Sequence, residues 1–118
     1  MFTVQETNAV LANNSRLSEA VGSALLCTEL DSEHHELAGE CAAYLHVSGW
    51  LKEQQEIYGG DLREATDDAI EELQCAGILT IEFLSWFFIR FVIAPYIGAL
   101  VREWLFGGEY GQAGAIGA

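Results

Sequence analysis

Residues 83–101, FLSWFFIRFVIAPYIGALV, form the most apolar stretch of the chain and contain a single charged side chain, Arg90. As a helix, these 19 residues extend about 28 Å at 1.5 Å per residue, close to the roughly 30 Å hydrocarbon thickness of a bilayer. The stretch therefore predicts a helix that is either embedded in lipid or buried in protein.

Two tryptophans, one within this stretch and one just after it, favour the bilayer. Trp86 and Trp104 are separated by about 27 Å along a continuous helix, which suits one indole near each lipid–water boundary. Arg90 lies about 6 Å inside Trp86, so its guanidinium can reach the nearer interface. We therefore expect residues 83–106 to form a transmembrane helix, with a lipid bilayer as its partner.

The alternative is a buried central helix of a soluble helical bundle or oligomer. The charge of Arg90 and the modest length of the run favour it. Against it, the large apolar residues between Phe83 and Ile93 surround the helix and leave no polar face, and a chain of 118 residues cannot easily cover large apolar groups on every side of one helix.

Polar and small residues within the stretch indicate helix–helix assembly. Glu82 lies about 80° around the helix from Arg90, so the two would pair more easily between neighbouring helices than within one. Ala94 and Gly98 have the small-xxx-small spacing that permits close helix approach. The membrane and assembly residues that we predict are Glu82, Trp86, Arg90, Ala94, Tyr96, Gly98, Arg102 and Trp104. A simple anchor without such assembly remains open.

The remaining sequence predicts an all-α fold. Residues 1–14 read as an extended or frayed arm, and residues 15–60 as an acidic helical region packed as a hairpin, with Asn14 or Ser15 as its first cap. Gly59 and Gly60 predict its end. Residues 61–82 form an amphipathic acidic helix, capped by Asp61, that continues unbroken into the apolar stretch; residues 107–118 form a flexible glycine-rich tail.

The charge balance excludes two classes of partner. The formal net charge is −13, from 18 acidic and 5 basic residues. Nucleic acids and anionic lipid surfaces are bound through clustered Lys and Arg, so neither is expected. A solvated acidic face or a high-salt host both explain the acidity. The cysteines Cys27, Cys41 and Cys75 read as small buried hydrophobes.

Chemical motifs are weak. Residues 29–40, ELDSEHHELAGE, gather carboxylates with His34 and His35, but a di-metal bundle needs a second helix of this kind, and whether Glu33 and the two histidines bind metal stays open. No nucleotide-binding, hydrolase or zinc motif is present. We expect no enzyme activity and no cofactor.

Three functions are consistent with these features. The first is a structural or accessory subunit of a membrane-associated assembly, such as a membrane complex or a lipid-containing virion. The second is a homo-oligomeric pore lined by the stripe from Glu82 to Tyr96. The third is a soluble helical oligomer that buries the aromatic helix at its interface. In the first two, a single span with the N-terminal region in the cytosol or interior is the simplest topology.

Overall fold

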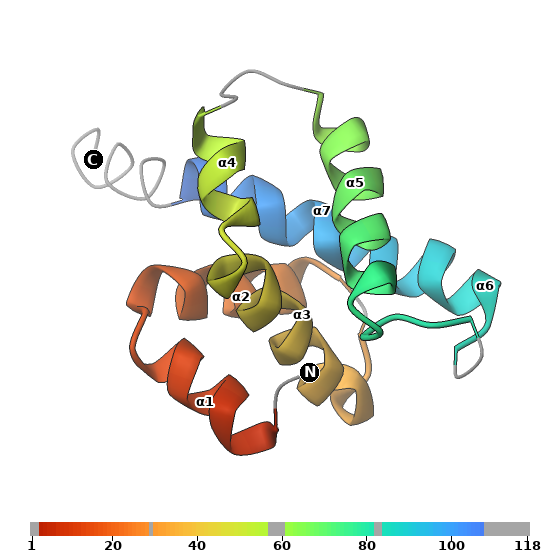
Figure 1. The fold of residues 1–118 in the computed structure, drawn as a ribbon, viewed down its shortest axis with the longest axis horizontal. Coiled ribbons are helices and arrows are strands. Elements are labelled where there is room, and N and C mark those ends of the chain that lie inside the picture. The colour runs from red at the N-terminus through yellow and green to blue at the C-terminus, as the bar shows by residue number, and fades with distance from the viewer. Residues whose placement is uncertain (1–2, 29, 57–60, 82–83, 108–118) are drawn as a thin grey trace.

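The computed structural model describes residues 3–28, 30–56, 61–81 and 84–107, and within these ranges it is all-helical without strands. Figure 1 shows the arrangement of the helices. They are α1 (Val4–Ala12), α2 (Ser15–Cys27), α3 (His35–Val47), α4 (Trp50–Glu56), α5 (Leu62–Cys75), α6 (Trp86–Phe88) and α7 (Ala94–Arg102). A 3₁₀ turn (Ser32–His34) precedes α3, and π-helical turns follow α6 (Ile89–Ile93) and α7 (Glu103–Gly107). The all-α prediction is confirmed.

The helix starts follow from capping side chains. Asn14 caps α2 by accepting from the Leu17 amide at 2.9 Å, as predicted. Asp61 also caps α5 as predicted, and its side chain accepts from the Arg63 amide at 2.9 Å. The prediction of an arm at the N-terminus was wrong: Thr3 and Glu6 form a reciprocal capping box, which satisfies two exposed amides and starts α1.

The prediction of one unbroken helix from the acidic segment into the apolar stretch was also wrong. Helix α5 ends at Cys75 because Gly77 adopts a left-handed φ of 80°. The amides of Gly77 and Ile78 donate to the Gln74 and Leu73 carbonyls, each at 3.0 Å, which closes the helix end in a Schellman motif. Gly49, with φ of 85°, similarly separates α3 from α4.

From Trp86 to Gly107 the helical segment is continuous. Ser85 caps it by accepting from the Phe88 amide at 3.0 Å. Pro95 lacks an amide proton and its ring crowds the preceding turn, which accounts for the π-helical turn Ile89–Ile93 directly before it. Pro95 therefore distorts the helix without ending it.

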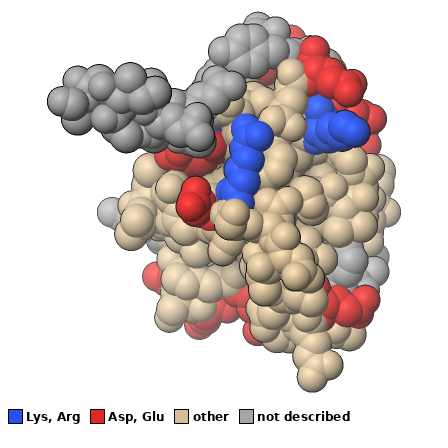
Figure 2. Space-filling view, turned by 90° about the vertical axis from the view of Figure 1, so that its left-hand side faces the viewer, with Lys and Arg blue, Asp and Glu red and all other residues tan. Residues whose placement is uncertain are grey.

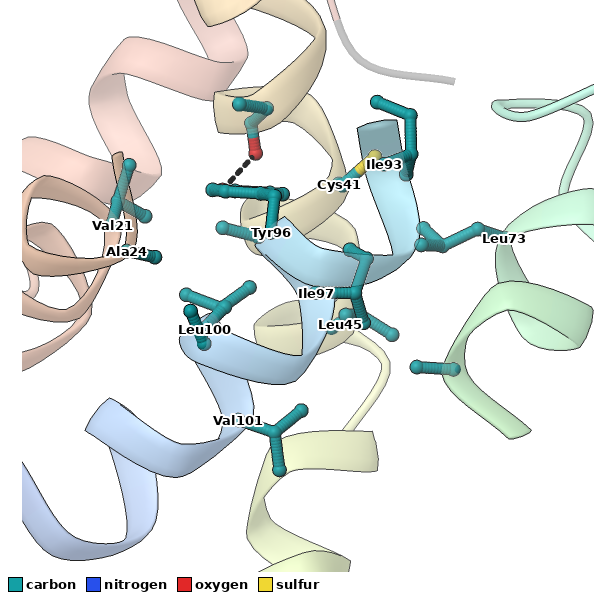
Figure 3. Packing of buried hydrophobic residues seen from close by; sticks show 14 of the residues in the cluster. Val21, Ala24, Cys41, Leu45, Leu73, Ile93, Tyr96, Ile97, Leu100 and Val101 are labelled. Carbon is teal, nitrogen blue, oxygen red and sulfur yellow. Dashed lines mark hydrogen bonds between the residues drawn. The ribbon is translucent and has the colours of Figure 1, made fainter. Parts of the chain in front are cut away.

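Helix α7 forms the centre of the core. It packs against α2 on one side and α5 on the other. Helix α3 packs in turn against α2. Figure 3 shows the apolar side chains of α7 pointing toward all three. The fully buried residues of this segment are Ile93, Tyr96, Ile97, Leu100 and Val101. The small chain thus covers most of the apolar stretch, which the sequence reading considered difficult.

None of the helices in the described ranges combines the length and the apolar character needed to cross a bilayer. Arg90, Arg102 and Glu103 all fall within the helical segment that was expected to span. The residues predicted as hairpin end (Gly59 and Gly60) and most of the predicted tail, from Gly108 onward, lie outside the described residues.

Candidate interaction surface

Three large aromatic side chains are exposed together where the apolar segment begins. The exposed fractions of Trp86, Phe87 and Phe91 are 53%, 68% and 65%. The rings of Phe87 and Phe91 stack with centroids 5.9 Å apart, and Trp86 meets Phe87 edge-on at 5.3 Å. We call these three residues the aromatic cluster. It belongs to α6 and the following turn, which lie at one end of the long axis of the molecule (Figure 1).

A groove runs beside the cluster, between α5 and the helical segment of α6 and α7. Its first compartment, of about 400 Å³, is lined by Leu62, Arg63, Thr66, Asp67, Arg90, Ala94, Pro95 and Gly98. Its second, of about 300 Å³, is lined by Asp67, Ile70, Glu71, Gln74, Trp86, Ile89 and Arg90. Asp67 and Arg90 line both and form an ion pair at 3.0 Å, so this pair separates two compartments of one groove, the α5–α6 groove.

The outer face of α5 is strongly acidic. Its exposed carboxylates are Glu64, Asp67, Asp68, Glu71 and Glu72. Asp67 is paired with Arg90, and Asp68 accepts from the Trp50 indole at 2.7 Å. Among the described residues Glu71 has no ion-pair partner. The aromatic cluster and the acidic face of α5 therefore border the same groove.

Charge is distributed differently at the end away from α6. Figure 2 shows that end as a mainly uncharged face, with Lys and Arg side chains in its upper half and Asp and Glu side chains both beside them and toward its margins. The chain contains only 5 basic residues, and Arg63 and Arg90 are the ones that line the α5–α6 groove.

The structure brings four of the predicted assembly residues together on the groove: Trp86, Arg90, Ala94 and Gly98. The small residue Gly98 lies against the Thr66 side chain of α5, and a Cβ at this position would approach its hydroxyl oxygen to 3.3 Å. The small-xxx-small pair thus permits close approach of two helices of the same chain.

The other predicted assembly residues lie elsewhere. Tyr96 is buried, and its hydroxyl donates to the Ala38 carbonyl at 2.6 Å (Figure 3). Burial raises the pKa of this phenol. Arg102 is exposed at the end of α7, and Glu82 lies outside the described residues.

Trp104 does not match Trp86, as an aromatic belt would require. Its exposed fraction is 5%, against 53% for Trp86. The Arg16 guanidinium lies 4.6 Å from the Trp104 ring centroid and donates to the Trp104 carbonyl. Cation–π contact and hydrogen bonding thus hold the π-helical turn after α7 against α2. The sequence reading missed Arg16 because nothing in its local pattern links it to a residue near the other end of the chain.

The acidic and histidine-rich segment is partly gathered. Ligand atoms of Asp31, Glu33 and His34 lie within 4.8 Å of one another, and the His34 ring packs on Phe88 with centroids 4.6 Å apart. His35 instead contacts the Leu30 carbonyl at 3.1 Å. Two of these donors are exposed carboxylates, an arrangement that also occurs without a metal.

The cysteines correct another prediction. Cys41 is buried as expected, and burial raises the pKa of its thiol, which leaves it protonated and a poor nucleophile. Cys27 and Cys75 are exposed. The interpretation of all three cysteines as buried hydrophobes was therefore wrong for two of them.

Comparison with known proteins assigns the chain to no group: no family model, curated protein or solved structure matches it.

Proposed function

We propose that the protein is a non-enzymatic helical subunit that assembles with another protein through the aromatic cluster. The observation that carries this proposal is the exposure of Trp86, Phe87 and Phe91 in mutual contact, on a chain whose other large apolar residues mostly lie in one core. Trp and Phe side chains exposed together are the kind of residue that anchors protein interfaces.

The size of the cluster suits this role. Aromatic side chains of this kind have about 150–250 Å² each, and more than half is exposed here, which leaves roughly 350 Å² of contiguous apolar surface. At about 25 cal/mol per Å², its burial contributes about 9 kcal/mol before the entropy losses of association. Rim contacts along α5 and the groove would bring the interface to the area of a specific complex.

A second candidate is supported by the composition of the cluster. An exposed Trp flanked by two Phe residues also suits shallow insertion into the interfacial region of an uncharged bilayer. Such insertion would let the protein belong to a membrane-associated assembly, the function expected from the sequence, without a spanning helix. The carboxylates of α5 beside the cluster would oppose approach to anionic lipid.

The pore hypothesis gains no support from the positions of the stripe residues. Ile89 and Tyr96 are buried, so they would have to leave the core in order to line a lumen. The third hypothesis, an oligomer that buries aromatic residues at its interface, shares the aromatic cluster with our proposal but makes the partner a second copy of this chain.

The test replaces the cluster and asks what the protein still binds. Trp86→Ser/Phe87→Ser/Phe91→Ser is expressed in the native cells beside wild type and Leu26→Ser, which alters an apolar side chain that is 90% exposed on α2. We expect wild type and Leu26→Ser to co-purify the same partner after mild detergent extraction, and the triple variant to lose it while keeping its circular dichroism. Retention of that partner by a folded triple variant would overturn the proposal.

Flotation with phosphatidylcholine vesicles distinguishes the second candidate. Vesicle binding by purified wild type that disappears in the triple variant would favour a bilayer, whereas sedimentation of a wild-type dimer that the triple variant abolishes would favour self-association. For the isolated wild-type chain we expect neither vesicle binding nor a dimer.

A further inference from the structure

We propose, resting on the assembly function above, that the α5–α6 groove receives a basic amphipathic segment of the protein partner. In this arrangement, apolar side chains of the segment pack on the aromatic cluster. A Lys or Arg side chain from the segment then occupies the second compartment, between Glu71 and Trp86.

The second compartment has the groups that a cationic side chain needs. Ile70 and Ile89 supply apolar contacts for the aliphatic stem of a Lys or Arg. The Glu71 carboxylate and the Trp86 indole supply an opposite charge and an aromatic face. Gln74 also lines this compartment and is uncharged.

The distribution of charge within the groove makes its second compartment the more favourable one for a cation. Arg90 is held by Asp67 at 3.0 Å, so this ion pair contributes little net charge. Arg63 lines only the first compartment, where it repels an entering cation. Glu71 lines only the second compartment. A cation is therefore attracted to the Trp86 end, which is also the end beside the aromatic cluster.

Charge complementarity identifies the partner as basic. The net charge of −13 makes two copies of this chain repel each other. The other exposed carboxylates of α5, Glu64, Asp68 and Glu72, are not among the lining residues, but they add to the negative charge of the helix that borders the groove. Because a bilayer offers no cationic side chain, and a second copy offers few, a basic amphipathic segment is the occupant that satisfies both the aromatic cluster and its acidic border.

The experiment measures binding of defined peptides to the full chain by fluorescence anisotropy. The probe is a labelled 18-residue Leu/Lys amphipathic helix; its controls are the Leu/Glu counterpart and a scrambled Leu/Lys peptide without an amphipathic face. The protein variants are Glu71→Gln and Trp86→Ser. Matched controls are Glu19→Gln and Leu26→Ser, which alter an exposed carboxylate and an exposed apolar residue of α2.

We expect the Leu/Lys helix to bind best and more weakly as salt rises. Glu71→Gln should weaken it by about threefold, as for one solvent-exposed ion pair. Trp86→Ser should weaken it by at least about tenfold, as for an interface anchor. The two control variants should bind like wild type.

Equal binding of the Leu/Glu or scrambled peptide, or equal losses in Glu71→Gln and Glu19→Gln, would overturn this inference. Its failure is distinguishable from that of the assembly function. If the native partner still depends on the aromatic cluster while the peptide ignores Glu71, assembly stands and the basic segment is wrong; if the partner also ignores the cluster, both are wrong.

Discussion

Truncation of Leu100 should destabilise the fold far more than truncation of Phe91, although both belong to the same apolar stretch. Leu100 is fully buried between α7 and its neighbours (Figure 3), whereas the exposed fraction of Phe91 is 65%. Leu→Ala at a buried site costs about 2–5 kcal/mol, from lost apolar transfer and the cavity left behind. For Phe91→Ala we expect at most about 1 kcal/mol, from the lost ring stacking and the residual burial.

Urea unfolding followed by circular dichroism measures the difference. With a slope of about 2 kcal/mol per M, a loss of about 3 kcal/mol lowers the unfolding midpoint of Leu100→Ala by about 1.5 M. The midpoint of Phe91→Ala should fall by no more than about 0.5 M. A Phe91→Ala loss equal to or larger than that of Leu100→Ala would refute the assignment of one residue to the core and the other to the surface.

Three further changes test local features. Tyr96→Phe removes the hydroxyl that donates to the Ala38 carbonyl at 2.6 Å, so we expect a loss of about 1–2 kcal/mol in urea unfolding. Gly77→Ala forces a side chain into φ of 80° and should cost about 1 kcal/mol, measured in the same way. Burial raises the pKa of the Glu40 carboxyl in the folded state above its ordinary 4.5. The protonated carboxyl therefore contributes fully to the stability of the fold below pH 4.5, and this contribution is lost as the pH rises through the raised pKa. Glu40→Gln should therefore raise the thermal midpoint at neutral pH and weaken its decline with pH; an unchanged pH profile would contradict this.

Local signals in the sequence predicted much of the secondary structure. Capping side chains located the starts of α2 and α5 at Asn14 and Asp61. Glycine chemistry was less decisive: the prediction of an unbroken helix ran through Gly77, although this residue ends α5. A glycine can occupy a helix interior or a left-handed C-terminal position, and only the packing of the following residues decides between them.

The environment of the apolar stretch was not predictable because lipid and a protein core select the same side chains. Whether Leu100 and Val101 face lipid or protein depends on α2 and α5, which are remote in the sequence. Trp86 and Trp104 have bilayer spacing, yet Trp104 is buried against Arg16. That contact depends on tertiary structure and leaves no trace in the spacing.

The groove was only half visible in the sequence. Trp86 and Arg90 were singled out because aromatic and charged residues stand out in an apolar run. Asp67 and Glu71 were not, since they are two among several carboxylates on a face that solvation alone explains. Their significance depends on which helix lies beside them, and this follows from the turn at Gly77.

The exposure of Trp86 relative to Trp104 is the most direct test of the central claim that the apolar segment packs on its own chain and leaves the aromatic cluster free. Acrylamide quenching would be measured on the full chain carrying only Trp86 (Trp50→Phe/Trp104→Phe) and on the chain carrying only Trp104 (Trp50→Phe/Trp86→Phe). With exposed fractions of 53% and 5%, we predict red-shifted, readily quenched emission from Trp86 and blue-shifted, protected emission from Trp104. Equal protection of both indoles, in a folded protein, would contradict this structure and restore the symmetric aromatic belt of a spanning helix.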